Sequence, residues 1–203
     1  MTELYSSDEI FESLYQYTHA ISIALDHRDH QTRLHSERVS ELSVELGQFC
    51  ELSPWEMSVL RVAASLHDVG KIGVKDAILG KADALDADEW ALMKEHSVIG
   101  ESIILAINTP SAKEASKVIR HHHEHFDGSG YPDGLCGDEI PLSSRIISIT
   151  DSYDAMAVTR SYHRQRSHDE IMVILAKEAG YKHDPRILEI FRKLIVDSPH
   201  RSA

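Results

Sequence analysis

Histidines recur on the apolar faces of predicted helices, and this pattern restricts the possible folds more than any other feature of the sequence. In residues 32–49 the spacing of Val39, Leu42 and Leu46 is that of one helix face, and extending this face by about one turn reaches His35. A histidine lies on the inward face of three more predicted helices in the same way. Those faces are Leu60, Ala64 and His67; Leu92, His96, Ile99 and Ile103; and Val118 with His122 beside Ile119 with His123.

Helix-start signals account for much of the remaining chain. Capping boxes, in which Ser or Asp is followed three residues later by Glu, begin at Ser53, Asp86 and Ser167. The second of them predicts a helix of about 20 residues. Further helices are predicted over residues 113–124, after Pro141 and over residues 185–195, and no long segment alternates apolar and polar residues as a strand would. The sequence therefore predicts an all-α helical bundle.

The length of 203 residues suits one substantial domain. Apolar residues at helical spacing over residues 8–25 predict an N-terminal helix, so residues 1–27 are interpreted as a packing or dimerisation segment. Residues 28–196 form the expected catalytic domain. Residues 197–203 are expected to fray, as chain ends commonly do.

Charge and composition exclude several classes of function. The formal net charge of −12 argues against binding to duplex nucleic acid, which normally requires a basic surface. The sequence has no apolar run near the roughly 20 residues needed to span a bilayer. The two cysteines, Cys50 and Cys136, do not form a disulfide framework, and we therefore expect a cytoplasmic protein.

The inward histidines are best explained as ligands of metal ions. A single histidine on an apolar face is usually a core residue with a satisfied hydrogen bond, but several buried imidazoles and carboxylates without shared partners would be costly. Nitrogen and oxygen ligands favour iron, manganese or another first-row metal over a thiolate zinc site. The seven candidate ligands, enough for two ions, are His35, His67, Asp68, His96, His122, His123 and Asp151.

Asp68 has a special position among these ligands, because its two carboxylate oxygens could bridge two metal ions. It follows His67 at the end of a predicted helix. Gly70 fits a helix C-terminus, where a left-handed backbone is often needed. Lys71 then lies just past the helix end, where it could reach an anionic group near the metals.

Three motifs in this order strongly resemble the HD-GYP subgroup of HD-domain phosphohydrolases. The resemblance covers about residues 30–192. The motifs are His67-Asp68-x-Gly70-Lys71-Ile72-Gly73; His122-His123-Glu124-x-x-Asp127-Gly128-x-Gly130-Tyr131-Pro132; and Asp151-x-Tyr153-Asp154-Ala155. The resemblance implies an HD-domain helical bundle with a Gly-Tyr-Pro loop and additional helices, which hydrolyses a cyclic dinucleotide, chiefly cyclic di-GMP.

The resemblance also assigns roles to individual residues. One metal would take His35, His67, Asp68 and Asp151, and the other Asp68, His96, His122 and His123. His67, Asp68 and Lys71 form the expected catalytic group, and the expected substrate-binding residues are Lys71, Tyr131, Asp154, Arg160 and Arg164. Members with three metals have a glutamate where this chain has Gln31, so we expect two metal ions.

The expected reaction is attack on phosphorus by a hydroxide that bridges the two metals. It would give linear pGpG, with GMP as the product of a further step. The alternatives are a cyclic GMP-AMP phosphodiesterase, a non-catalytic module that binds cyclic dinucleotides, a di-iron oxygenase and a dNTP phosphohydrolase. The Gly-Tyr-Pro loop is also a candidate surface for protein partners.

Overall fold

The computed structural model describes residues 21, 23, 30–81, 83–158 and 165–202, so nearly all of the predicted N-terminal helix of residues 8–25 lies outside the described part. The helical elements within these ranges are α2 (His30–Phe49), α3 (Pro54–Leu66), η1 (Val69–Gly73), α4 (Asp76–Leu79), α5 (Ala87–Lys94), α6 (His96–Leu105), α7 (Pro110–Arg120), η2 (Gly137–Glu139), α8 (Leu142–Ala157), α9 (His168–Glu178) and α10 (Pro185–Leu194). The same ranges contain two isolated β-bridges and no named strand. The predicted all-α class is confirmed.

The predicted helix starts are present. The Ser53 hydroxyl accepts from the backbone N–H of Glu56, and the Glu56 carboxylate accepts from the backbone N–H of Ser53. The same reciprocal pair opens α5 at Asp86 and α9 at Ser167. Each cap satisfies N–H groups that the helix itself cannot pair, which contributes about 1 kcal/mol.

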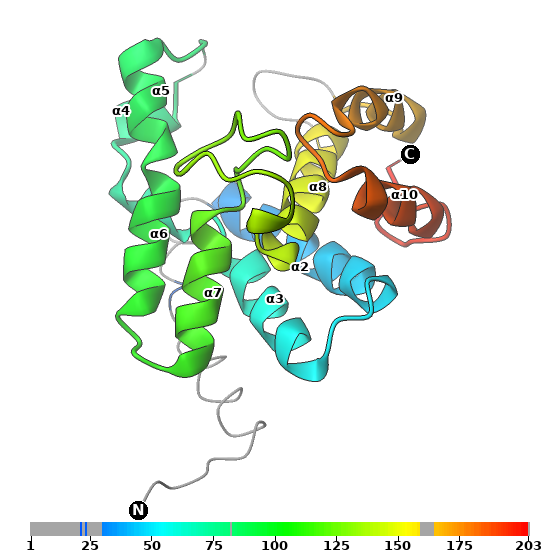
Figure 1. The fold of residues 1–203 in the computed structure, drawn as a ribbon. Coiled ribbons are helices and arrows are strands. Elements are labelled where there is room, and N and C mark those ends of the chain that lie inside the picture. The colour runs from blue at the N-terminus through cyan, green and yellow to red at the C-terminus, as the bar shows by residue number, and fades with distance from the viewer. Residues whose placement is uncertain (1–20, 22, 24–29, 82, 159–164, 203) are drawn as a thin grey trace, which may run out of the picture.

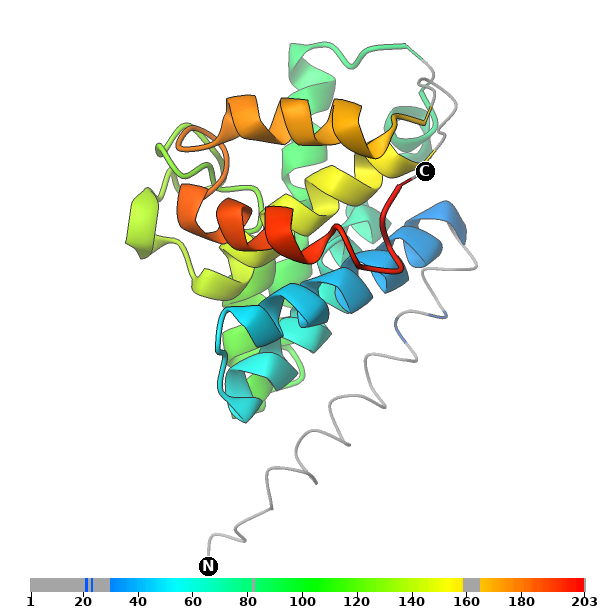
Figure 2. The same cartoon turned by 90° about the vertical axis from the view of Figure 1, so that its right-hand side faces the viewer.

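Helix α8 is the centre of the bundle (Figure 1). It contacts α2, α3, α7, α9 and α10, and α2 also packs along α3. Helix α6 stands beside α7 and holds η1. Figure 2 shows α9 and α10 lying together against α8 and α2. The packed interior is apolar, and Leu46, Leu60, Ile119 and Ile147 are fully buried in it.

The long helix expected after Asp86 is two helices, α5 and α6, separated at Glu95. At the junction, Nδ1 of His96 donates to the carbonyl of Met93 and the Ser97 hydroxyl donates to the carbonyl of Lys94. Such side-chain bonds compete with the helical backbone pattern. Leu92, which was expected on the inward face, is 48% exposed.

Helix α7 ends at Arg120, and not near Glu124 as predicted. His121 follows it with a φ of −105° and a ψ of 11°, outside the helical region, so His122 and His123 lie on the turn after the helix. The two neighbouring histidines are therefore not on adjacent rows of a helix. The turn places the two imidazole rings next to each other, with their centroids 4.0 Å apart.

The end of the chain is not frayed over the residues that the structure describes. The backbone N–H of Ser202 donates to the Tyr153 hydroxyl, and the Ser202 hydroxyl donates to the carbonyl of Arg166. Ser198 is also buried and donates to the Glu45 carboxylate. These bonds hold Ser198 and Ser202 against the bundle, within the segment that was expected to fray. No helix in the described ranges is long and apolar enough to cross a membrane.

Candidate metal centre

His67 and Asp68 come from the end of α3, where the helix gives way to η1. The ring Nδ1 of His67 donates to the carbonyl of Ala64 at 2.8 Å, which leaves the lone pair on Nε2. This Nε2 is buried and has no hydrogen-bond partner among the described residues. A buried acceptor without a partner is costly, and a cation in front of it would satisfy it.

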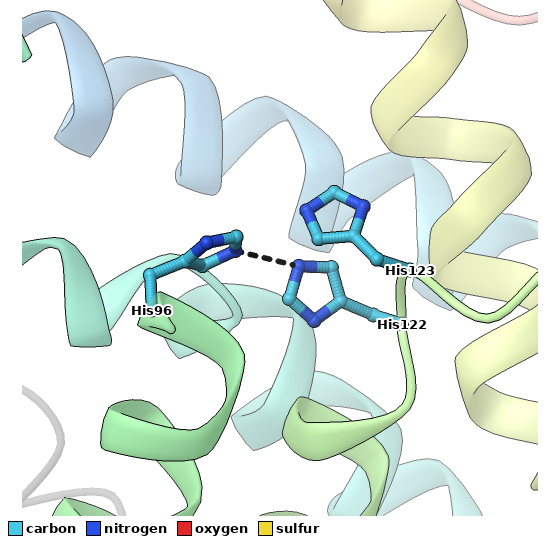
Figure 3. Close-up of side chains that lie close together, drawn as sticks. All are labelled: His96, His122 and His123. Atoms are coloured by element: carbon cyan, nitrogen blue, oxygen red, sulfur yellow. Dashed lines mark hydrogen bonds between the residues drawn. The ribbon is translucent and has the colours of Figure 1, made fainter. Parts of the chain in front are cut away.

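His96 and His122 are oriented by the same device. Nδ1 of His96 donates to the carbonyl of Met93 at 2.7 Å, and Nδ1 of His122 donates to the carbonyl of Ile119 at 2.6 Å. The two Nε2 atoms then face each other at 3.4 Å, as Figure 3 shows. Two nitrogen lone pairs at this distance repel unless a proton or a cation lies between them. Backbone-oriented imidazoles of this kind are typical metal ligands.

The first ligand group consists of His96, His122 and His123, and one ligand atom of each lies within 4.8 Å of the others. Their rings are close, with centroids 5.4 Å apart for His96 and His122 and 4.0 Å apart for His122 and His123 (Figure 3). Burial, followed by the neighbouring histidines, lowers the pKa of His122 to about 3. The same two causes hold the pKa of His123 well below its usual value. Neutral imidazole is the form that binds a metal.

The second ligand group consists of His35, His67 and Asp151, again with ligand atoms within 4.8 Å of one another. Nε2 of His35 lies 3.0 Å from Oδ1 of Asp151. Burial alone would lower the pKa of His35, but its hydrogen bonds with Asp151 and Asp154 raise this pKa to about 9. His35 therefore carries a proton at neutral pH when no other cation is present in this group.

Asp68 lies between the two groups. Its Oδ2 is 3.5 Å from Nε2 of His67, and its Oδ1 is 3.6 Å from Nε2 of His96. Nζ of Lys71 donates to Oδ2 of the same carboxylate at 2.5 Å. Burial alone would raise the pKa of Asp68, but Lys71 and the histidines hold it well below its ordinary value. Asp68 is thus a charged carboxylate that faces one group with each oxygen.

The structure places Asp154, which was predicted to bind substrate, against His35 and Arg38. Its Oδ2 accepts from Nδ1 of His35 at 2.6 Å, and Arg38 donates to both of its oxygens. Asp154 is buried and holds the His35 ring from behind, so that Nε2 points toward Asp151. The sequence reasoning missed Arg38, although it lies three residues after His35 and so on the same helix face.

The Gly-Tyr-Pro loop packs against the centre through Tyr131. The ring of Tyr131 lies 4.9 Å from the ring of His123, and the backbone N–H of Tyr131 donates to the carbonyl of His123. Glu124 is buried, and its Oε1 accepts from the backbone N–H groups of Asp133 and Gly134. Sequence reasoning gave Glu124 no role of its own, although it adjoins the two histidines.

The structure therefore brings together all seven predicted ligands, with Lys71 and Tyr131 beside them. Arg160 and Arg164 lie outside the described residues. The donor set fits divalent metal ions, because His67, His96 and His122 offer Nε2 atoms without protons, and Asp68 and Asp151 offer charged carboxylates. The Nε2 of His67 is also buried and without a partner among the described residues. The helical bundle and its buried centre of histidines and aspartates together indicate a helical metal-binding protein.

The chain belongs to the HD domain family, whose model matches residues 19–187. This finding and the relatives described next confirm the expected resemblance to the HD-GYP group. The family is metal-dependent.

Curated relatives agree with this assignment. A cyclic di-GMP phosphodiesterase of Thermotoga maritima is 35% identical over 92% of this chain, which covers 50% of that protein. A 3′3′-cGAMP-specific phosphodiesterase 2 of Vibrio cholerae is 34% identical over 90% of this chain and 35% of its own length. The chain thus spans between a third and a half of the length of these relatives.

Solved structures share the fold. The cyclic GMP-AMP specific phosphodiesterase V-cGAP3 of V. cholerae matches with a TM-score of 0.70 and 19% identity, over 92% of this chain and 50% of that one. The Bdellovibrio bacteriovorus protein Bd1817 matches with a TM-score of 0.67 and 18% identity, over 92% of this chain and 64% of that one. At these identities the likeness supports the fold alone.

Proposed function

We propose that this chain is a metal-dependent phosphodiesterase that hydrolyses cyclic di-GMP to the linear dinucleotide pGpG, with GMP as the product of a further step. The observation that supports it most is the pair of ligand groups joined by Asp68, with Lys71 beside the joint. Paired sites of this kind suit displacement at phosphorus. The names of the relatives from T. maritima and V. cholerae support cyclic dinucleotides as the substrate class.

Divalent ions held by the two groups would supply Lewis acidity toward the phosphodiester and would activate the attacking water. Lys71 is 24% exposed at its side chain, and its ammonium has N–H donors beyond the one used on Asp68. These donors would hold a non-bridging phosphate oxygen and offset the charge that develops there. The bond from phosphorus to the ribose 3′-oxygen breaks as water adds, and that oxygen takes up a proton.

Tyr131 would contribute a neutral hydrogen-bond donor beside the two ligand groups. Burial, and then the charges of Asp68 and Asp151, raise the pKa of its phenol far above the usual value. The hydroxyl therefore stays protonated and can donate to a phosphate or ribose oxygen of the substrate. Its position against His123 keeps the ring fixed while it does so.

Two ions, iron or manganese, fit the two ligand groups of histidine and aspartate. Gln31 is the reason for expecting no third ion, and its side chain lies outside the described part. We further propose a cytoplasmic location, protein partners that bind the loop of residues 127–134, and a homodimer.

A homodimer would not be required for the candidate ligands to be oriented. His67, His96 and His122 are each oriented by a backbone carbonyl of the same chain.

Cyclic GMP-AMP is the second candidate substrate. Relatives of comparable identity carry the name 3′3′-cGAMP-specific phosphodiesterase, including a second protein of V. cholerae that is 34% identical over 84% of this chain. The two substrates differ in one purine base, so the metal groups and Lys71 would act on both alike. A comparison of turnover decides between them.

The test is anaerobic turnover of both cyclic dinucleotides by protein loaded with iron or manganese, with the products separated by chromatography. We expect linear product from cyclic di-GMP, and a loss of at least about a thousandfold in the double variant His67→Ala with Asp68→Ala. Asp138→Asn is the control, because this exposed aspartate pairs with Arg145 and Arg186 away from the centre. Unchanged turnover in the double variant would contradict the catalytic assignment. An absence of product with bound metal would favour a binding module or an oxygenase.

A further inference from the structure

Helix α5 exposes a tryptophan next to the candidate metal centre. Trp90 is 48% exposed, and its ring lies 6.3 Å from the ring of Tyr131 in an edge-to-face arrangement. Tyr131 in turn lies 4.9 Å from the ring of the ligand His123. A row of aromatic rings therefore runs from the candidate ligand His123, through Tyr131 of the Gly-Tyr-Pro loop, to the exposed Trp90 on α5.

A cation completes this surface. Nζ of Lys94, one turn after Trp90 on the same helix, lies 5.8 Å from the centroid of the Tyr131 ring. Within the described residues, no carboxylate pairs with this ammonium. The Trp90 ring and the Lys94 ammonium thus both lie next to the Tyr131 ring. A positive charge at this place contrasts with the net charge of −12 of the chain.

An exposed apolar residue alone would carry no such meaning, because single apolar residues are common on protein surfaces. Leu92 on the same helix is an example, since it is also 48% exposed. Trp90 differs because its ring contacts Tyr131, which itself contacts the candidate ligand His123. Its indole also offers a flat π surface with little rotamer freedom to lose.

We propose that Trp90 and Lys94 form the base-binding wall of the substrate site, in which Trp90 stacks on a purine base and Lys94 contacts the anionic sugar-phosphate ring. This inference rests on the proposed function, since it needs a substrate with both a base and a phosphodiester. Aromatic rings bind bases through stacking that tolerates any base, and a lysine adds attraction to phosphate. Neither residue would touch the reacting phosphorus, so both determine substrate binding.

The two tryptophans of the chain allow a direct binding test. Trp55 lies near the start of α3 and His67 just after its end, so the two are about 18 Å apart along the helix. In Trp55→Phe the emission comes from Trp90 alone, and in Trp90→Phe it comes from Trp55 alone. We expect cyclic di-GMP to quench the emission of Trp55→Phe and to leave that of Trp90→Phe unchanged. Dimethyl phosphate, a phosphodiester without a base, should quench neither.

Kinetics provide the second readout. Trp90→Ala is expected to raise KM about tenfold or more with little change in kcat, and Trp90→Phe is expected to keep most of the affinity. Lys94→Met is expected to raise KM several-fold and to weaken the dependence of KM on salt. Leu92→Ala, the matched control, should leave both constants unchanged.

The outcomes separate this inference from the proposed function. If the protein hydrolyses cyclic di-GMP but Trp90 emission and the KM of Trp90→Ala do not change, the base-binding role of Trp90 is contradicted and the proposed function stands. If no dinucleotide is hydrolysed, the proposed function fails, and quenching of Trp90 by cyclic di-GMP still supports the wall. Absence of that quenching overturns the wall in either case.

Discussion

Asp154 fixes the orientation of one candidate ligand without facing the ligand groups itself. Its carboxylate accepts from Nδ1 of His35 and is held in turn by Arg38. Partners of this kind set the ring position and the basicity of a metal-binding histidine. We therefore predict that Asp154→Asn lowers metal affinity about 10- to 100-fold while the fold is kept.

Metal titration of the two proteins, with circular dichroism as the check on folding, measures this effect. Asp138→Asn, which also removes a charge from an arginine pair, is the control and should bind metal normally. Equal affinity in Asp154→Asn and the unmodified chain would contradict the positioning role.

The charge on His35 predicts that metal binding releases a proton. Its pKa of about 9 means that His35 is protonated at pH 7 in the metal-free protein, whereas a metal ligand must be neutral. His122, with a pKa of about 3, is already neutral and releases none. Release from His35 should be nearly complete at pH 7 and should decline as the pH rises through about 9.

Calorimetric titration at pH 7 in two buffers with different ionisation enthalpies counts the protons released. Asp154→Asn removes the charge of one of the two carboxylates whose hydrogen bonds raise this pKa, and it should reduce the number of protons released. A heat of binding that does not depend on the buffer would show that His35 is neutral before the metal arrives.

The convergence of the seven candidate ligands could be predicted from the sequence because each lies at a helical spacing or in a motif with a direct chemical meaning. The role of Asp154 could not, because the motif places it one turn after Asp151 and so on the same side of α8. Only the position of α2 shows that His35 and Arg38 occupy both of its oxygens. The role of Asp154 therefore depends on contacts between segments that are distant in the sequence.

At the scale of the elements, Gly70 lets η1 lie directly against α6. A Cβ added at Gly70 would be 1.8 Å from the carbonyl oxygen of His96, a backbone atom that cannot turn aside. We predict that Gly70→Ala destabilises the protein by about 3 kcal/mol or more and weakens metal binding, because α6 and its histidine must move away from Asp68.

Thermal unfolding and metal titration measure both effects. Gly80→Ala is the matched control, since its new Cβ would meet only the Asp76 carbonyl oxygen, at 3.3 Å. Similar melting temperatures for the two variants would contradict the close packing of η1 on α6.

Helix beginnings could be predicted more accurately than helix ends. The capping boxes at Ser53, Asp86 and Ser167 are local in sequence, and all three are present. At the break at Glu95 and at the early end of α7, histidine rings bond to the backbone carbonyls of Met93 and Ile119. An apolar pattern alone does not reveal these ends.

At the scale of the whole molecule, the candidate ligands join segments that are far apart in the chain. His35 is on α2, His67 and Asp68 follow α3, His96 begins α6, His122 and His123 follow α7, and Asp151 is on α8. Without a cation, the unpartnered Nε2 of His67 and the facing Nε2 atoms of His96 and His122 remain at the point where these helices converge. Metal occupancy should thus stabilise the bundle as a unit, and not one helix.

We predict that a chelator lowers the melting temperature by about 10 °C when the metal had been present at about a thousand times its dissociation constant. That occupancy contributes about 4 kcal/mol, and a chain of this size loses about 2–4 °C per kcal/mol. Scanning calorimetry measures the shift, and hydrogen exchange should show faster opening of α2 and α8 together. The variant His67→Ala with Asp68→Ala, which removes ligands from both groups, should melt at the same temperature with and without chelator. If the unmodified chain also ignored the chelator, the helices would be held by their apolar core alone, and the ligand groups would contribute nothing to the fold that positions them.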